Sequence, residues 1–276
     1  MSTSEPEFLP PQETALSRQF IEKGYVVLPV EDRASLDRLR AAVVELSAEQ
    51  LGEPLSEDPA HFLNYVHERV SVGNLNEFRL SIFRGLNADA HARPRYYSLQ
   101  RSAVQILVGN ELCMQRNLNL SIQFPGDDSS LLPIHGDVLN GDSPFEVVQW
   151  TPLVDVYATK SMFILSPEKT AVIYARFSEF ETLGNDALYR AAEPDLVWID
   201  VKYGEAVLFN QTLFHGNIQN TEGETRWSLN CRYKGVFTPY ADKKLGEYFE
   251  PITLRAASRI GLDYGLPDGY REGREK

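Results

Sequence analysis

Apolar residues recur at helical spacing in the first third of the chain. A helix is predicted over residues 13–23, because Gly24 is well suited to follow its last turn. A second is predicted over residues 35–50, capped at Ser35, and its apolar positions repeat every three or four residues: Leu36, Leu39, Val43 and Leu46. The β-branched run at residues 25–30 predicts a strand. Residues 62–70 and 74–86 are expected to be helical or irregular, and the polar, proline-rich first twelve residues to be frayed.

From about residue 103 the pattern changes to the alternation that is typical of strands. Residues 117–124 alternate strictly, with polar side chains on one face: Asn117, Asn119, Ser121 and Gln123. Further strands are predicted at 145–152, 161–166, 196–201, 206–210 and 226–236. Short strands after a helical start predict a mainly β fold, a sandwich or barrel braced by flanking helices. We expect one domain over 1–276, with a helical part at about 13–100, a β core at about 103–240 and a C-terminal extension at 241–276.

A second strand also has one strongly polar face. In residues 226–233 this face carries Arg226, Ser228, Asn230 and Arg232. Two interpretations are open: the polar faces point to solvent, as in a half-exposed antiparallel sheet, or they line a polar barrel interior. The pattern alone slightly favours solvent.

Composition and charge exclude several classes of protein. The chain has 276 residues, 43% of them hydrophobic, which excludes disorder, and no apolar stretch approaches the roughly 20 residues that span a bilayer. A net charge of −12 argues against binding nucleic acid or anionic membranes. Two cysteines, Cys113 and Cys231, are too few for a disulfide scaffold, and Cys231 is expected to be a buried free thiol. The N-terminal residues do not read as a signal peptide, so we expect a cytoplasmic protein.

The candidate chemistry begins at His135-Gly-Asp137. In extended backbone, residues i and i+2 project to the same side, so this imidazole and carboxylate can reach one ion. The motif alone is weak and requires a third ligand, for which His215, just after the predicted strand at 206–210, is the candidate. Two histidines and one carboxylate are the ligands of the non-haem Fe(II) facial triad, which leaves three positions open.

Arg226 has the charge needed to bind a cosubstrate that occupies those open positions. A keto acid such as 2-oxoglutarate can chelate iron at one end, and its distal carboxylate then needs a cation some distance from the metal. Arg226 lies eleven residues after His215, on the polar face described above, and Ser228 offers a hydroxyl beside it. The combination of His135-x-Asp137, His215 and Arg226-x-Ser228 arises by chance much less often than any one of these parts.

With these motifs the chain resembles the phytanoyl-CoA dioxygenase-like Fe(II)/2-oxoglutarate-dependent oxygenases. The resemblance covers most of the chain, including the opening at residues 20–29 and the strand at 149–155. It implies a double-stranded β-helix (a cupin-like jelly-roll) core, polar faces turned inward, and Fe(II), 2-oxoglutarate and O2 as cofactor and cosubstrates. The resemblance implies that His135, Asp137 and His215 are catalytic metal ligands, and that Arg226 and Ser228 bind 2-oxoglutarate.

Two details of the resemblance concern individual residues. Among the polar residues of 117–123, Gln123 lies nearest in sequence to the metal motif and is our choice as a further 2-oxoglutarate contact. The carboxylate of Asp137 argues against a halogenase, in which a small residue makes room for halide. Residues 159–162 and 166–168 depart from the usual family pattern, and this departure resembles the branch found in bacterial carbohydrate and aminoglycoside clusters.

The implied activity is oxidation, by hydroxylation or ring closure, of a small polar metabolite of sugar or aminoglycoside type. Acidic residues after the metal motif, Asp142 and Glu146, would attract ammonium groups if they lay at the mouth of the site. Residues 74–79 are rich in hydrogen-bonding groups and could form the floor of a substrate site. Loops within 55–100 and 167–195 are expected to set selectivity.

Two alternatives stay open. A zinc hydrolase or metal-dependent isomerase can use the same two histidines and carboxylate, and a jelly-roll can bind carbohydrate without catalysis. The remaining histidines, His61, His67 and His91, are expected to be surface or packing residues. No apolar stripe in the sequence requires a partner subunit, so the oligomeric state stays open.

Overall fold

The described chain begins with helix α1, strand β1 and helix α2, and a proline or a capping side chain sets where each helix starts. The computed structural model describes residues 8–265, so most of the terminus predicted to be frayed lies outside it. Helix α1 (Pro11–Lys23) begins earlier than predicted, because a proline at the first helical positions has its φ angle already set. Helix α2 (Arg33–Leu51) is capped by Asp32, whose carboxylate accepts from the backbone N–H of Ser35 at 2.9 Å, rather than at Ser35 itself.

The main sheet contains most of the strands. Within the described residues the order is β1-β7-β4-β9-β2-β10, and β3 pairs with the other half of β9. All of these pairings are antiparallel. The strands are β1 (Tyr25–Pro29), β2 (Leu112–Gln115), β3 (Asn119–Gln123), β4 (Glu146–Pro152), β7 (Glu205–Asn210), β9 (Arg226–Gly235) and β10 (Phe249–Thr253).

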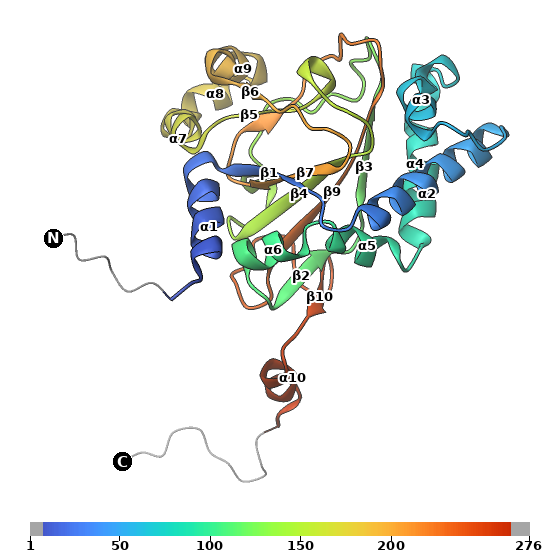
Figure 1. The fold of residues 1–276 in the computed structure, drawn as a ribbon. Helices are drawn as coiled ribbons and strands as arrows, with labels where there is room; N and C mark the ends of the chain where they lie inside the picture. The colour runs from blue at the N-terminus through green and yellow to red at the C-terminus, as the bar shows by residue number, and fades with distance from the viewer. Residues whose placement is uncertain (1–7, 266–276) are drawn as a thin grey trace, which may run out of the picture.

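A smaller sheet with the order β6-β5-β8 forms the second layer of the jelly-roll. Its strands are only two residues long: β5 (Phe163–Ile164), β6 (Val197–Trp198) and β8 (His215–Gly216). Helices α7 (Pro167–Ala175), α8 (Phe177–Leu183) and α9 (Asn185–Ala192) lie beside this sheet (Figure 1). Their apolar side chains form one core cluster with Phe163 and Phe214.

Further helices cover the main sheet on its outer side, where α2, α4 and α5 lie away from α7–α9 (Figure 1). They are α3 (Pro59–Asn64), α4 (Val72–Ala88), α5 (Ala92–Ser98) and α6 (Arg101–Val108). Helix α10 (Ala256–Asp263) follows β10, buries none of its residues and lies apart from the sheet (Figure 1). Short 3-10 turns lie at Val66–Glu68, Asp137–Asn140, Ala158–Lys160 and Glu193–Asp195. Among the described residues, no helix combines the length and apolarity needed to cross a membrane.

Alternation along β9 decides the question that the sequence left open. Trp227 and Leu229 point outward, and the Trp227 indole donates to the carbonyl of Leu63 at 2.8 Å. Arg226 and Arg232 point the other way and line an interior cavity. The polar face therefore lies inside the barrel, not in solvent, and the slight preference of the pattern for solvent is wrong. The thiol of Cys231 is free and buried, as predicted.

Three segments differ from the sequence-based predictions. Residues 101–108 form α6, so strands begin later than residue 103; a short apolar run fits a strand or a buried helix, and packing on β4 and β9 favours the helix. Residues 167–192 are helices α7–α9 rather than loops. Within 241–276, described to residue 265, strand β10 joins the main sheet by pairing with β2.

Candidate metal centre and cosubstrate pocket

Two backbone strands bring the candidate metal ligands together. His135 and His215 form an antiparallel bridge, with both N–H···O distances at 2.9 Å, although they are far apart in the sequence. Asp137 begins the 3-10 turn Asp137–Asn140 directly after the extended Gly136. One ligand atom from each of His135, Asp137 and His215 lies within 4.8 Å of the others. The structure thus assembles the three residues that the sequence predicted as ligands.

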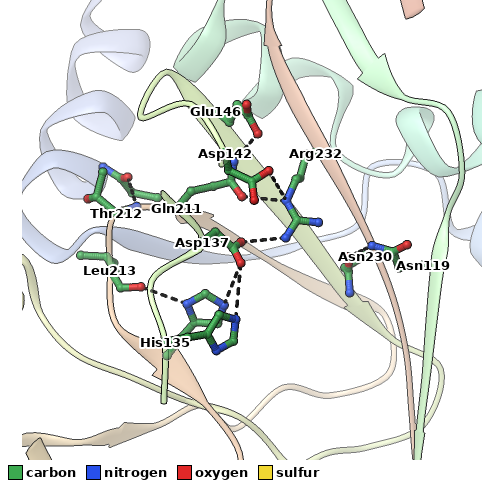
Figure 2. Close-up of polar contacts among 12 residues, drawn as sticks. Asn119, His135, Asp137, Asp142, Glu146, Gln211, Thr212, Leu213, Asn230 and Arg232 are labelled. Carbon is green, nitrogen blue, oxygen red and sulfur yellow. Dashed lines mark hydrogen bonds and ion pairs between the residues drawn. The ribbon is translucent and has the colours of Figure 1, made fainter. Parts of the chain in front are cut away.

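Backbone carbonyls fix which nitrogen of each imidazole faces the site. Nδ1 of His135 lies 2.8 Å from the carbonyl of Pro133, and Nδ1 of His215 lies 2.9 Å from that of Leu213. A carbonyl can only accept, so each Nδ1 carries a proton and Nε2 is the nitrogen left to bind a metal. Both Nε2 atoms point toward the Asp137 carboxylate, at 3.4 Å and 4.0 Å (Figure 2).

Burial and charge favour the metal-binding protonation state at His215 and Asp137, whereas at His135 a metal would have to displace a proton that Asp137 helps to hold. Burial lowers the pKa of His215 to about 4, so this imidazole is neutral at pH 7. Burial also lowers the pKa of His135, but the hydrogen bond and charge of Asp137 outweigh it and raise the pKa overall. For Asp137, burial is opposed by the two histidines and Arg232, which together hold its pKa well below the usual range. This donor set suits a divalent transition metal and leaves part of the coordination sphere open.

Arg226 lies in the same cavity without a counter-ion. Its guanidinium donates to the carbonyl of Ser161 and to the hydroxyl of Ser121, each at 3.1 Å, while its Nε has no partner. No carboxylate among residues 8–265 forms an ion pair with this side chain, which is only 3% exposed. Burial without a counter-charge lowers the pKa of Arg226 to about 10, so it still carries its charge at pH 7. Burying an unpaired cation costs free energy, and an anionic ligand bound beside it would offset this cost.

The cavity between the metal ligands and Arg226 has apolar walls. Val148, Trp150, Met162 and Phe209 line it together with Ser121 and Asn230. Trp150 therefore faces the cavity, whereas Trp227 belongs to the core, where its ring packs edge-on against Phe78. The cavity thus combines three candidate metal ligands with a buried arginine that forms no ion pair among residues 8–265.

The structure separates the other predicted contacts for 2-oxoglutarate. Ser228 is fully buried, its Oγ has no hydrogen-bond partner, and it is not among the residues that line the cavity. Gln123 donates to the carbonyl of Ile218 at 2.7 Å and does not line the cavity. Ser121 lines it and contacts Arg226, so the geometry favours Ser121 over Gln123. The sequence could not separate Ser121 from Gln123, because both lie on β3 opposite a predicted 2-oxoglutarate contact on β9. Gln123 lies opposite Arg226, and Ser121 lies opposite Ser228.

A second arginine was not assigned from the sequence. Nη2 of Arg232 donates to Oδ2 of Asp137 at 2.8 Å, and its Nε donates to Gln211 at 2.7 Å and lies 3.3 Å from Asp142 (Figure 2). The opposing carboxylates raise the pKa of Arg232 despite its burial. The alternation that put Arg226 and Arg232 on the same polar face of residues 226–233 was the available signal.

Two acidic residues do not lie where an ammonium group could meet them. Asp142 and Glu146 are each 2% exposed, and Lys243 reaches Asp142 at 2.5 Å. Glu146 accepts from the backbone of Ser143 at 2.9 Å and from the Gln211 amide. Asp142 contacts Arg232 directly, and Glu146 does so through Gln211, so both carboxylates lie in the buried network next to the metal centre. The suggestion that they attract substrate at the mouth of the site is wrong.

The remaining histidines stay away from the centre. His67 hydrogen-bonds to the hydroxyl of Thr225 at 2.8 Å, and His61 packs beside Tyr65. His91 is exposed next to α5. In residues 8–265, His135, Asp137 and His215 are the group found to be arranged for a metal.

Comparisons with known proteins agree with this architecture. No protein-family model matches the sequence, and no curated protein sequence matches it either. Solved structures do match. The non-heme monooxygenase ThoJ, solved as a nickel complex, has a TM-score of 0.52 and 16% identity, over 87% of this chain and 84% of ThoJ. The chain has the fold of the non-heme iron, 2-oxoglutarate-dependent oxygenases.

Two further solved structures with this fold match this chain over nearly their full lengths. HygX from Streptomyces hygroscopicus, solved with nickel and 2-oxoglutarate bound, has a TM-score of 0.52 and 15% identity, over 89% of this chain and 98% of HygX. SnoK, an alpha-ketoglutarate-dependent carbocyclase from nogalamycin biosynthesis, has a TM-score of 0.50 and 18% identity, over 91% of this chain and all of SnoK. At these identities the likeness establishes the jelly-roll fold, and the chemistry rests on the site itself.

Proposed function

We propose that the chain is an Fe(II)/2-oxoglutarate-dependent oxygenase that oxidises a small polar, sugar- or aminoglycoside-type metabolite in a biosynthetic pathway. The observation that carries the proposal is Arg226, a buried cation without a counter-ion in the same cavity as the metal ligands. A metal-dependent hydrolase or isomerase needs no such cation. A carbohydrate-binding jelly-roll needs neither the cation nor the ligands.

The chain's own residues have defined parts in this function. His135, Asp137 and His215 hold the metal through two Nε2 atoms and a carboxylate oxygen. Arg226, with Ser121 and Ser228 close by, binds the distal carboxylate of 2-oxoglutarate. The apolar walls of the cavity exclude water and so favour coupled turnover over side reactions.

Bound Fe(II) supplies the coupling of O2 reduction to the decarboxylation of 2-oxoglutarate. In a hydroxylation, a substrate C–H bond, O2 and 2-oxoglutarate give C–OH, succinate and CO2. One oxygen atom of O2 enters the hydroxyl group and the other enters succinate, so atoms and electrons balance. Relatives with this fold include a carbocyclase, so oxidative ring closure belongs to the same proposal.

An anaerobic titration tests the proposal. Fe(II) and then 2-oxoglutarate are added to metal-free protein, and the weak visible charge-transfer band of a chelated keto acid is recorded. We expect a band in the wild type. Arg226→Ala should need at least about 30-fold more 2-oxoglutarate, since removing one partner of a buried charge pair costs about 2–5 kcal/mol.

A matched control separates this effect from a general loss of positive charge. Arg84 on α4 is exposed and lines neither the metal cavity nor the cavities beside it, so Arg84→Ala should titrate like the wild type. A wild-type protein without a band at saturating 2-oxoglutarate would overturn the oxygenase proposal. A band that is equally strong in Arg226→Ala would remove Arg226 from it.

A further inference from the structure

A second, larger cavity opens beside the metal centre. Its volume is about 670 Å³, and it shares with the inner cavity the residues Ser121, Leu132, His135, Asn230 and Arg232. The inner cavity is lined by the candidate metal ligands and Arg226, so this outer cavity, which shares five lining residues with it, offers a substrate a route toward them. Its outer walls come from α4 and from residues 129–132.

The polar groups of this outer cavity are almost all neutral. Amides and hydroxyls on four segments line it: Asn76, Asn119, Ser129, Ser130 and Asn230. Two of them are already linked, since the Asn119 amide donates to the Asn230 amide at 2.9 Å. Such groups both donate and accept, as the hydroxyls of a sugar-type molecule require. No aspartate or glutamate lines the cavity.

The charged groups of the lining are two arginines, and they differ in how far they are neutralised. Arg232 is held by Asp137 and Asp142. Arg79 on α4 donates to the amide oxygen of Asn76 at 2.7 Å, and no carboxylate of residues 8–265 forms an ion pair with it. Arg79 therefore brings a positive charge to the wall of the cavity without a counter-charge.

Three carboxylates around the two cavities are directed elsewhere, and the exposed Glu77 and Asp128, which adjoin lining residues in the sequence, are not part of the lining. Asp127, at the start of the loop in the outer wall, is 2% exposed and accepts from Ser129 and Ser130 within its own loop. Asp142 and Glu146 are buried behind the metal centre, as described above. Although the chain has a net charge of −12, the lining itself thus carries Arg79 as a cation that forms no ion pair with a carboxylate of residues 8–265.

We propose that the outer cavity binds a polyhydroxylated substrate that carries an anionic group, a carboxylate or a phosphate, with Arg79 as the residue that recognises the anion. This inference rests on the proposed function and narrows its substrate class. A polycationic aminoglycoside would bring ammonium groups against Arg79 and find no carboxylate on the wall. A sugar-derived anion meets a cation at one end and amides and hydroxyls along its length.

A matched panel of ligands tests the charge preference directly. The probes are D-glucose, D-glucosamine, D-glucuronate, D-glucose 1-phosphate and UDP-glucose, titrated calorimetrically into protein loaded with Mn(II) and 2-oxoglutarate, so that no turnover occurs. We expect at least one anionic probe to bind about tenfold more tightly than glucose, and glucosamine to bind more weakly than glucose. The carboxylate and phosphate probes distinguish the two kinds of anion.

Three variants tie the preference to Arg79. Arg79→Gln should weaken the preferred anion about tenfold and leave glucose unchanged, since one charge-assisted hydrogen bond is lost. Arg79→Lys should keep most of the preference. Arg84→Gln removes the same charge from an exposed position on the same helix, away from the cavity, and should bind all probes like the wild type.

Several outcomes would overturn the inference: glucosamine binding as tightly as the anions, an unchanged order of affinities in Arg79→Gln, or no anionic probe binding at millimolar concentration. The anaerobic charge-transfer band is recorded on the same protein without any sugar. A missing band means that the proposed function has failed. A normal band without an anion preference means that only the assignment of Arg79 and the substrate class has failed.

Discussion

Nη2 of Arg232 lies 2.8 Å from Oδ2 of Asp137, so the carboxylate of the candidate metal centre is shared with a cation from β9. The other carboxylate oxygen, Oδ1, is the one that faces His135 and His215 (Figure 2). Arg232 thereby directs one oxygen to the metal and occupies the other, and it favours binding through a single oxygen. Gln211 and Asp142 hold the guanidinium in place from the opposite side.

Replacing Arg232 should weaken metal binding more than 2-oxoglutarate binding. Arg232→Gln is expected to lower the affinity for Mn(II) about 10–100-fold, the usual effect of losing a group that orients a metal ligand. Arg232→Lys should recover part of this loss, because it keeps the charge but not the two-sided contact. Titrations of Mn(II), and of 2-oxoglutarate at saturating Mn(II), separate the two effects. An Mn(II) affinity equal to that of the wild type in Arg232→Gln would show that Asp137 needs no such support.

Arg226 should lower the stability of the protein when 2-oxoglutarate is absent. Its charge is buried without a counter-ion, so Arg226→Met, which removes the charge and keeps much of the volume, should be at least as stable as the wild type. Added metal and 2-oxoglutarate should raise the melting temperature of the wild type by mass action but add little in the variant beyond the metal alone. Thermal melts with Mn(II), with and without 2-oxoglutarate, provide the measurement. A marked loss of stability in ligand-free Arg226→Met would contradict an uncompensated charge.

Ser121 and Gln123 should contribute differently to cosubstrate binding. Ser121→Ala removes the hydroxyl that holds Arg226, and we expect it to weaken 2-oxoglutarate binding about 3–10-fold, the worth of roughly one hydrogen bond. Gln123→Leu removes a contact to Ile218 outside the cavity and should affect stability rather than 2-oxoglutarate affinity. The charge-transfer band measures both affinities, and a larger effect on 2-oxoglutarate affinity in Gln123→Leu would restore Gln123 as a contact.

The metal ligands could be predicted because their signal is short and local. His135 and Asp137 share a motif, and His215 follows a strand that alternation predicted as 206–210, where β7 runs from Glu205 to Asn210. The inward direction of Arg226 could not be obtained from alternation, because period two separates two faces without saying which one is inside. Only the resemblance to a known family predicted it, and the structure confirms it.

The parts that sequence missed depend on contacts between distant segments. Strand β10 is five residues long and contains a proline, and only its pairing with β2 makes it a strand. The ion pairs of Arg232 and the hydrogen bond from Arg79 to Asn76 set how much free charge each arginine keeps. Composition gave one net charge for the whole chain and could not show which charged side chains line the outer cavity.

Gly216 should be needed for the bridge between the two histidine strands. A Cβ at this position would lie 2.7 Å from the carbonyl oxygen of Leu132 and 3.1 Å from the backbone nitrogen of Ile134, and backbone cannot move aside cheaply. Gly216→Ala should therefore cost about 1–3 kcal/mol of stability and weaken metal binding by displacing the adjacent His215. Chemical denaturation and Mn(II) titration test this. Gly73→Ala, which meets nothing within 4 Å, is the control; it should leave Mn(II) binding unchanged and cost no stability, because alanine is favoured over glycine in a helix such as α4.

Glu146 should give the protein a dependence of stability on pH near neutrality. Burial raises the pKa of this carboxyl to about 7, against an ordinary value of 4.5. The folded protein therefore holds the proton more tightly than the unfolded chain. This contribution to stability is complete below about pH 4.5 and is lost as the pH rises through 7. The charged groups that face Glu146 act in opposite directions, since Asp142 raises its pKa and Arg232 lowers it.

Glu146→Gln, which cannot titrate, isolates this effect. The stability of the wild type relative to the variant should fall between pH 5 and pH 8.5, by at most about 3 kcal/mol, because each pKa unit corresponds to about 1.4 kcal/mol. Urea denaturation of both proteins across this range gives the difference, in which the titration of all other groups largely cancels. Asp200→Asn, at an exposed position, serves as the control and should run parallel to the wild type. A difference between wild type and Glu146→Gln that stays constant over this range would mean that Glu146 is already ionised in the folded protein at pH 5.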